Sequence, residues 1–276
     1  LKKNKILINV NITNNTTTNI INYKSGFLNI YNIRAKNNIE NTYRSLIKSY
    51  ELSNYANFIG ILTLPINKNK IKRTYNNFVD QTDFFKKMNK KNISNMMFIY
   101  KNLIVCPLTT HIRLNKVTSS YKNKKYFIDK IISINNTLIY DFKITKPRLI
   151  LSSINPHGGE NNMFGNEDTK YLKPIVDKLK KLKINIIGPN PADSLISKNK
   201  INNYDCYLFT YHDQALIPFK YISNNSGVNY TGNLNIIRTS PAHGTAYDII
   251  NNKEANSSAL LNCFKIIRKI NKNRAN

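Results

Sequence analysis

Short apolar runs alternate with segments of helical pattern along most of this 276-residue chain. Residues 148–154 and 204–210 are mostly apolar and of strand length, whereas residues 168–183 carry apolar side chains at helical spacing. Strands that alternate with helices form mainly parallel sheets covered by helices on both faces. The length suits one large α/β domain or two small ones. We therefore expect a three-layer α/β fold around a mainly parallel sheet.

The same patterns place further elements along the chain. Residues 1–25 are rich in Asn and Thr and are predicted to be weakly structured, and residues 26–276 are predicted to form a single unit. Helices are expected over 39–55, 126–138, 168–183 and 255–272, and apolar runs of strand length cover 58–64, 96–100, 103–108, 148–154, 184–187 and 204–210.

The chain is strongly basic, with 42 Lys and Arg against 15 Asp and Glu and a formal net charge of +27. Clustered cations would favour a nucleic-acid partner. Here the lysines are spread over the whole chain, and Lys, Asn, Ile and Tyr are the residues that AT-rich codons encode. Drift in a base-biased genome explains the charge, so we expect no nucleic-acid partner.

The cysteines and the apolar runs indicate the compartment. Cys106, Cys206 and Cys263 are far apart and lie among apolar residues, which is typical of reduced thiols. No apolar run approaches the length of a membrane span, and the apolar part of the start is too short for a signal peptide. We expect a cytoplasmic protein with no membrane partner.

All four histidines lie in short polar motifs. His157 and His212 each follow an expected strand, and His111 is expected to do so. In parallel sheets, ligands bind beyond the carboxyl ends of the strands. Neutral imidazole is a good ligand for Zn, Co or Mn. A lone histidine at a turn is more commonly a surface residue, so the pattern by itself leaves both interpretations open.

Two carboxylates accompany these motifs. Asp213 follows His212 directly, and Asp193 lies in the turn Pro191–Ser194. A carboxylate beside an imidazole can orient it or share its metal ion. Both residues are candidates for proton transfer or for support of the ligands, and the sequence does not choose between them.

Longer motifs carry a resemblance to a known family. The segments 155–160, 188–193, 211–220 and 237–246 occur in the same order and spacing as in the PdxA family, the 4-hydroxythreonine-4-phosphate dehydrogenases of pyridoxal phosphate synthesis. Residues 109–112 and 64–68 resemble two further motifs, and the resemblance covers roughly residues 57–260. It implies the isocitrate and isopropylmalate dehydrogenase fold, with two interleaved subdomains around a central cleft, in a homodimer.

The resemblance also implies a role for each matching residue. His111, His157 and His212 match three ligands of a divalent metal ion (Zn, Mg or Co) that the two subunits share. The residues that match the family's binding site for a small phosphorylated substrate are Gln81, Thr82, Lys220, Asn229 and Arg238. The residues that match its NAD or NADP site are His243, Gly244, Thr245, Ala246 and Asp248. The implied reaction is oxidation of 4-phosphohydroxy-L-threonine followed by decarboxylation to 3-amino-2-oxopropyl phosphate.

The chain departs from the family pattern in four places. The N-terminal Gly-Asp-Pro-Ala-Gly-Ile-Gly-Pro-Glu segment is not recognisable, Gln81 replaces the His of Gly-His-Thr-Glu, Ala242 replaces an Asp, and residues 250–253 have lost the glycines of the nucleotide loop. Three alternatives follow: a dehydrogenase for another phosphorylated hydroxy acid, such as threonate or erythronate 4-phosphate, a non-catalytic homologue, and a basic nucleic-acid binder.

Overall fold

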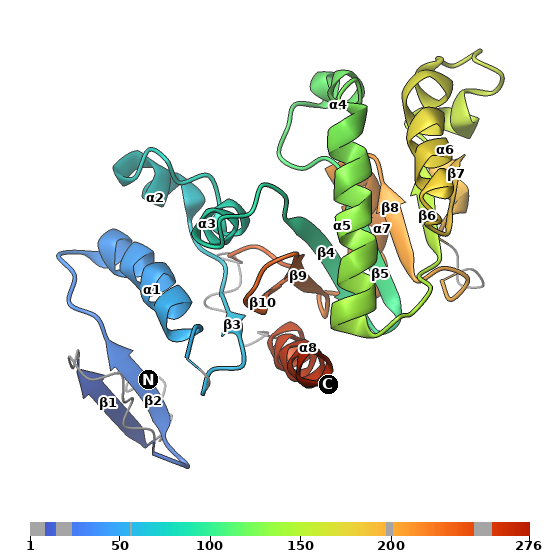
Figure 1. Cartoon of the computed structure of the whole chain (residues 1–276). Coiled ribbons are helices and arrows are strands. Elements are labelled where there is room, and N and C mark those ends of the chain that lie inside the picture. The colour runs from blue at the N-terminus through green and yellow to red at the C-terminus, as the bar shows by residue number, and fades with distance from the viewer. Residues whose placement is uncertain (1–8, 15–23, 56, 197–200, 246–255) are drawn as a thin grey trace.

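The computed structural model describes residues 9–14, 24–55, 57–196, 201–245 and 256–276. Its centre is an eight-stranded sheet (Figure 1). In the order in which they pair, the strands are β3 (Ile61–Leu62), β10 (Arg238–Pro241), β9 (Val228–Gly232), β4 (Asn95–Tyr100), β5 (Leu103–Pro107), β8 (Cys206–Phe209), β6 (Leu149–Ser152) and β7 (Ile186–Asn190).

The strand directions bring the polar motifs to one edge of the sheet. β5, β8, β6 and β7 pair in parallel, and so do β3 and β10. The pairs β10–β9, β9–β4 and β4–β5 are antiparallel. Because β5, β8 and β6 run the same way, the segments that follow them leave the sheet at the same edge. These segments carry His111, His212 and His157.

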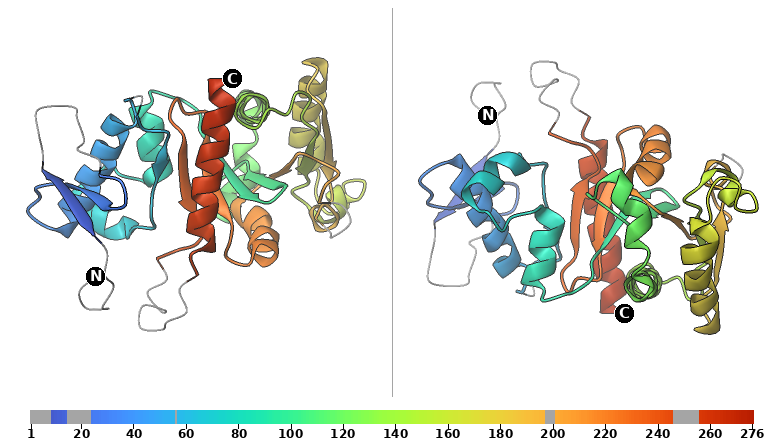
Figure 2. Two further views of the ribbon diagram at one scale, coloured as in Figure 1. Left: turned by 90° about the horizontal axis from the view of Figure 1, so that it is seen from below. Right: turned by 90° about the horizontal axis from the view of Figure 1, so that it is seen from above.

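Helices cover both faces of the sheet, so the expected three-layer fold is confirmed. On one face lie α5 (Lys124–Phe142), α6 (Lys173–Lys181) and α8 (Ser258–Ala275), which share the largest apolar cluster with the strands. On the other face α7 (His212–Ser223) packs against β5 and β8. Figure 2 shows α8 crossing the middle of the molecule, with α5 seen end-on next to one end of it.

A separate apolar cluster lies beside β3. It joins α1 (Asn38–Leu52), α2 (Lys68–Thr74) and α3 (Gln81–Met88), and it contains Phe78, Phe84 and Phe85. In Figure 1 these helices lie at the opposite end of the molecule from α6. The remaining short helix, α4 (Leu114–Ser120), follows β5.

Polar side chains define where several helices begin. Asn37 accepts the backbone N–H groups of residues 39 and 40 at the start of α1, and Asn123 accepts that of Tyr126 in α5. Asp80 accepts the backbone N–H of Asp83 at the start of α3. These N-caps satisfy donors that the first helical turn leaves unpaired. The polar residues between the apolar runs therefore set the helix boundaries.

The structure corrects two expectations near the N-terminus. Within residues 1–25, where weak structure was predicted, Val10–Asn14 forms a strand, β1, which pairs in parallel with β2 (Leu28–Asn32). Its alternating Val10 and Ile12 give it strand character that the surrounding Asn and Thr residues hide. The run 58–64 forms only the two-residue β3 at the sheet edge, where Leu64 is exposed.

The other expected elements are close to those observed. Residues 148–154 and 204–210 contain β6 and β8, and residues 126–138 lie within α5. The expected helix over 168–183 begins with a π-helical turn, Asp168–Leu172, before α6. Among the described helices, none is both long and apolar enough to cross a membrane.

Candidate functional site

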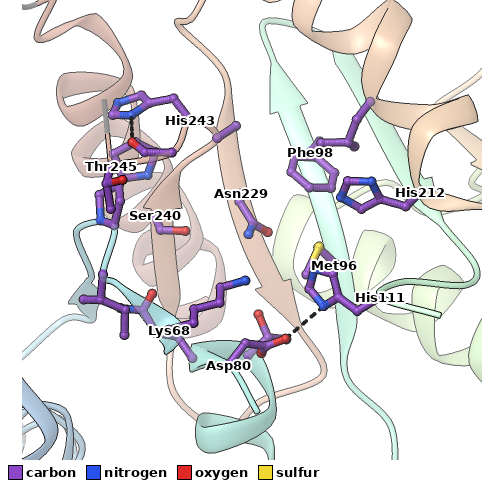
Figure 3. Close-up of a pocket in the computed structure, with 18 of the residues that line it drawn as sticks. Lys68, Asp80, Met96, Phe98, His111, His212, Asn229, Ser240, His243 and Thr245 are labelled. Carbon is purple, nitrogen blue, oxygen red and sulfur yellow. Dashed lines mark hydrogen bonds and ion pairs between the residues drawn. The ribbon is translucent and has the colours of Figure 1, made fainter. Parts of the chain in front are cut away.

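A cavity of about 560 Å³ opens on the face of the sheet opposite α5 and α8 (Figure 3). It brings together many of the side chains that the sequence singled out. Those lining it are Gln81, Thr82, His111, His212, Lys220, Asn229, Arg238, His243, Gly244 and Thr245. Lys68, Asp80, Met96, Phe98 and Ser240 also line it.

The alternation of side chains along β4 and β9 explains the floor of this cavity. In β4, Met96 and Phe98 face the cavity, whereas Met97 and Ile99 belong to the core under α5. Asn229 of β9 likewise faces the cavity between two core residues. Successive residues of a strand point to opposite faces. One set of strands thus builds both the core and the floor of the site.

His111 and His212 form a pair at one end of the cavity. Their ring centroids are 5.7 Å apart. The Nδ1 of His111 lies 3.0 Å from Oδ2 of Asp80, and the Nδ1 of His212 lies 2.6 Å from Oδ1 of Asp213. A carboxylate that accepts Nδ1–H leaves Nε2 as the metal-binding atom, which is the common arrangement around histidine ligands. The donor set therefore fits a divalent metal ion.

The histidine pair by itself supplies two ligands. Within the described residues of one chain, no group of three or more His, Cys, Asp or Glu side chains could hold a metal ion. Protein-bound Zn has at least three protein ligands in nearly all known sites. A complete site on this pair therefore needs a ligand from outside the described part of a single chain.

Buried hydrogen bonds place His212 at the start of α7. Gln214 accepts from Oγ of Ser152 at 2.7 Å and from the backbone N–H and Oγ1 of Thr210 at 3.0 and 2.8 Å, and its Nε2 donates to the carbonyl of Ser153 at 2.8 Å. These bonds connect the first turn of α7 to the ends of β6 and β8. The Tyr-His-Asp-Gln motif thus contains both His212 and the residue that anchors its helix.

Asp80 is a buried carboxylate, and each of its two oxygens contacts a nitrogen. One oxygen accepts from the backbone N–H of Asp83, and the other contacts His111. Burial alone would raise the pKa of Asp80, but the hydrogen bonds from His111 and from Asp83, together with the positive charge of Lys68, lower this pKa to about 2. Asp80 is therefore ionised at neutral pH.

Arg238 lies buried in the wall of the cavity. Its nitrogens donate to Oγ1 of Thr63 at 2.6 and 3.2 Å, to Oγ1 of Thr231 at 3.0 Å and to Oε1 of Gln81 at 2.7 Å. Burial lowers the pKa of Arg238 to about 10, against the opposing attraction of Asp80. The guanidinium therefore stays charged at neutral pH, and it adds positive charge to the cavity wall.

Gln81 and Thr82 lie beside this guanidinium at the start of α3. The side-chain oxygen of Gln81 accepts from Arg238 and from Thr63, and its Nε2 donates to the carbonyl of Leu64 at 3.1 Å. Thr82 accepts from Arg238 at 3.4 Å. The Gln81 side chain thus holds Arg238 in place.

The remaining polar groups face the open part of the cavity. Figure 3 shows Lys68 and Asn229 directed toward the same space. The Oδ1 of Asn229 is buried and has no hydrogen-bond partner among the described residues. Such an acceptor is expected to receive a donor from a ligand. Three cations, Lys68, Lys220 and Arg238, line the cavity against the carboxylate of Asp80, so its potential favours an anion.

Two predicted residues lie elsewhere. His157 is in a short turn after β6 (η2, Pro156–Gly159), and Asp193 is in another after β7 (η4, Ala192–Ser194). These turns pack against each other, and neither residue lines the cavity. Asp213 lines a neighbouring hollow of about 400 Å³ on the other side of the histidine pair. Ala246 and Asp248 lie outside the described residues.

No role was expected for Lys68 or Asp80 from the sequence. Lys68 is the first residue of α2, where it follows the cap Asn67, and it belongs to the short motif at 64–68. Asp80 reads in the sequence as an ordinary N-cap, since Asp is a favoured residue before a helix. Its contact with His111, which is 31 positions away, exists only in the folded chain.

The fold and the cavity together define a class of protein. It is a three-layer α/β protein with a cationic cavity and a carboxylate-supported histidine pair at the carboxyl ends of its strands. The family model described as "Pyridoxal phosphate biosynthetic protein PdxA" matches residues 3–267. The chain belongs to this family.

Individual relatives agree with this assignment. A 4-hydroxythreonine-4-phosphate dehydrogenase of Aquifex aeolicus is 37% identical over 77% of this chain and 65% of its own length. A D-threonate 4-phosphate dehydrogenase of Salmonella typhimurium is 30% identical over 81% of this chain and 68% of its own length. A crystal structure of the Klebsiella pneumoniae 4-hydroxythreonine-4-phosphate dehydrogenase, at 23% identity, has the same fold with a TM-score of 0.79 over 96% of this chain and 83% of that one.

The chain is matched to only part of its relatives. Four curated 4-hydroxythreonine-4-phosphate dehydrogenases match it over 52% to 66% of their own lengths. The family of the chain is shown by these comparisons. Its activity, its substrate and its partners are matters for proposal.

Proposed function

We propose that this chain is a metal-dependent dehydrogenase that uses NAD or NADP to oxidise 4-phosphohydroxy-L-threonine to 2-amino-3-oxo-4-phosphooxybutanoate, which loses CO₂ to give 3-amino-2-oxopropyl phosphate. The observation that carries the proposal is the His111–His212 pair, with a carboxylate on each Nδ1, at the end of a cationic cavity. The names of the relatives supply the substrate class.

The cavity has the groups that this substrate requires. Lys68, Lys220 and the charge of Arg238 suit its phosphate. The unpaired Oδ1 of Asn229 suits a hydroxyl or ammonium donor of the substrate. Met96 and Phe98 give the floor an apolar surface that excludes water. A small molecule with an anionic end and a polar end fits this arrangement.

His111 and His212 would hold the metal ion, and His243, Gly244 and Thr245 would contact the nucleotide at the opposite end of the cavity. A divalent metal held there would supply Lewis-acid activation of the substrate hydroxyl, and a bound nicotinamide would supply the hydride acceptor. Asp213 fixes the orientation of His212, so we assign it a supporting role. Asp193 is then the candidate for accepting the hydroxyl proton.

We propose that a second copy of the chain completes the site with His157. The turn that carries His157 continues into a loop where Met163 is 76% and Phe164 is 49% exposed. The hollow behind the histidine pair is lined by apolar side chains such as Ile112, Leu114 and Val117. Docking of the loop into this hollow would bury both apolar surfaces. It would also bring Asp193, which lies in the turn packed against that of His157.

The name of one relative and the replacement at Gln81 support a second candidate substrate. A relative named for D-threonate 4-phosphate is 30% identical to this chain, and Gln81 replaces the histidine of the family motif. D-threonate 4-phosphate has a hydroxyl where 4-phosphohydroxythreonine has an amine. Both compounds present a phosphate and a hydroxy acid to the same cavity.

Turnover with each compound tests the proposal. We expect reduced nicotinamide to form from 4-phosphohydroxy-L-threonine, to require a divalent metal, and to stop when a chelator is added. A higher kcat/KM with D-threonate 4-phosphate would select the second substrate. No turnover with either compound, at any metal concentration, would contradict the enzyme and favour a non-catalytic homologue. If the inactive protein bound nucleic acid tightly and in a salt-sensitive way, that result would favour the alternative of a basic nucleic-acid-binding protein.

A further inference from the structure

We propose that Asp80 is a positioning residue for the metal site, which fixes His111 in the tautomer that carries its proton on Nδ1. The inference rests on the proposed function, because it assigns His111 a metal ion. Asp80 lines the cavity, and its proposed role lies in its contact with His111. It acts through His111, whose Nε2 it keeps free of a proton and available as a ligand.

The geometry makes Asp80 a rigid support. One of its oxygens accepts the backbone N–H of Asp83 at 2.8 Å, which locks the side chain onto the start of α3. The other oxygen lies 3.0 Å from Nδ1 of His111. His111 lies in the turn after β5 with a φ of +54°, outside any helix or strand. An imidazole on such a turn needs an external contact to fix its ring.

Asp80 and Asp213 differ in exposure although each contacts one imidazole. The side chain of Asp80 is 10% exposed, whereas that of Asp213 is 72% exposed. The two imidazoles are similarly exposed, at 40% and 38%, so the difference lies in the carboxylates. Solvent screens the carboxylate of Asp80 less than that of Asp213, although the Asp213 contact is shorter, at 2.6 Å against 3.0 Å.

The first turn of α3 serves both ends of the site. Asp80 contacts His111, and the next residues, Gln81 and Thr82, contact Arg238. A single helix start thus links the metal ligand to the buried cation of the anion-binding wall. A change at Asp80 that preserves the helix cap would remove the contact with His111 and leave the hydrogen bonds of Arg238 in place.

Metal affinity of the whole protein tests this role. The variants Asp80→Asn and Asp80→Ser keep an N-cap oxygen for the Asp83 backbone, and both lose the carboxylate that accepts from His111. Zn²⁺ or Co²⁺ is titrated into metal-free protein in competition with a chromophoric chelator. We expect both variants to bind the ion about 10- to 100-fold more weakly than the wild type, which is the usual effect of losing such a partner.

Asp83→Asn is the matched control. It removes the same charge from the same helix, but the carboxylate of Asp83 pairs with Lys86 and Lys87. We expect its metal affinity to equal that of the wild type. Equal loss in Asp83→Asn and Asp80→Asn would mean that the effect is general to the helix charge, and it would overturn the proposal.

The tautomer of His111 provides a second readout that needs no metal. Long-range ¹H–¹⁵N spectra of histidine rings distinguish the two tautomers, and the four histidines of the chain can be assigned by substitution. We expect the Nδ1–H form of His111 in the wild type and a loss of this preference in Asp80→Asn. Unchanged tautomer and unchanged metal affinity in the Asp80 variants would overturn the role. A wild type that binds no divalent ion would instead contradict the proposed function, and the tautomer would still decide the role of Asp80.

Discussion

Arg238 is a buried cation whose acceptors, among the described residues, are uncharged oxygens of Thr63, Thr82, Thr231 and Gln81. Buried charges are usually paired with an opposite charge. Its burial lowers the pKa of the guanidinium only to about 10, so the charge remains at neutral pH. The charge is therefore available to attract a phosphate. Gln81 holds it without neutralising it.

Gln81→Glu tests this balance at a single residue. A carboxylate at this position would accept from Arg238, as the amide oxygen does at 2.7 Å, and it would also cancel the positive charge. The new ion pair with Arg238 would offset the lost hydrogen bond from Nε2 of Gln81 to the carbonyl of Leu64, so we expect little change in the free energy of unfolding. We expect the dissociation constant for inorganic phosphate, measured by calorimetry, to increase about tenfold, which corresponds to about 1.4 kcal/mol.

Gln81→Met is the control for the same position. It has a similar size but no acceptor, so it leaves the buried donors of Arg238 and Thr63 without their partner. The free energy of unfolding should fall by about 1–3 kcal/mol. Unchanged phosphate binding in Gln81→Glu would contradict the proposed role of the Arg238 charge.

At the scale of elements, α5 supports the turn that leads to His111. It inserts Lys130 beneath the sheet, where the buried Nζ donates to the carbonyl of Leu108 at 2.9 Å. Burial lowers the pKa of Lys130 to about 8, although the electrostatic interaction with Cys106 acts to raise this pKa. Folding therefore disfavours the charged form of this amine.

The pH dependence of stability follows from this shift. Because the pKa of Lys130 falls from 10.5 to about 8 on folding, the unfolded chain binds the proton more tightly between these values. Stability contributed by this group should rise with pH over that window, by about 3 kcal/mol in total. Denaturant unfolding of the wild type and of Lys130→Met at pH 7 and pH 10 measures it. The difference in unfolding free energy between the two proteins should change by most of that amount, because pH 10 lies just below the unfolded pKa of 10.5. A constant difference would contradict it.

The sequence predicts elements best where one physical signal dominates. β6 and β8 are buried on both faces, so apolar residues follow one another within them instead of alternating with polar ones. β3 is shorter than its apolar run because it lies at the sheet edge with a single partner, β10. β1 was not predicted because Asn and Thr surround its two apolar residues, and its pairing with β2 supplies the backbone hydrogen bonds that define it.

At the scale of the whole molecule, the motifs located most of the cavity but did not show how its residues are connected. His111, His212 and Arg238 were expected from their motifs, and they line one cavity. Asp80 and Lys68 were not expected in the cavity, because Asp80 has the pattern of an ordinary N-cap and the motif at 64–68 was given no role. His157 does not line the cavity that holds the other two histidines, so in the proposed metal site it would come from a second subunit.

Mixing of inactive variants tests this shared site most directly. His157→Ala lacks the ligand that one subunit would donate, and His212→Ala lacks a ligand of the receiving pair. Each variant alone should be inactive. In a mixed dimer, one of the two sites has all three histidines. Random reassortment of equal amounts should therefore restore up to about a quarter of wild-type turnover of the phosphorylated substrate.

A mixture of His111→Ala with His212→Ala is the matched control, because both changes affect the same half of the site and neither subunit offers an intact pair. We predict recovery of turnover in the first mixture and none in the control. No recovery in the first mixture, although size-exclusion chromatography with light scattering shows that mixed dimers form, would contradict a metal site built from two subunits.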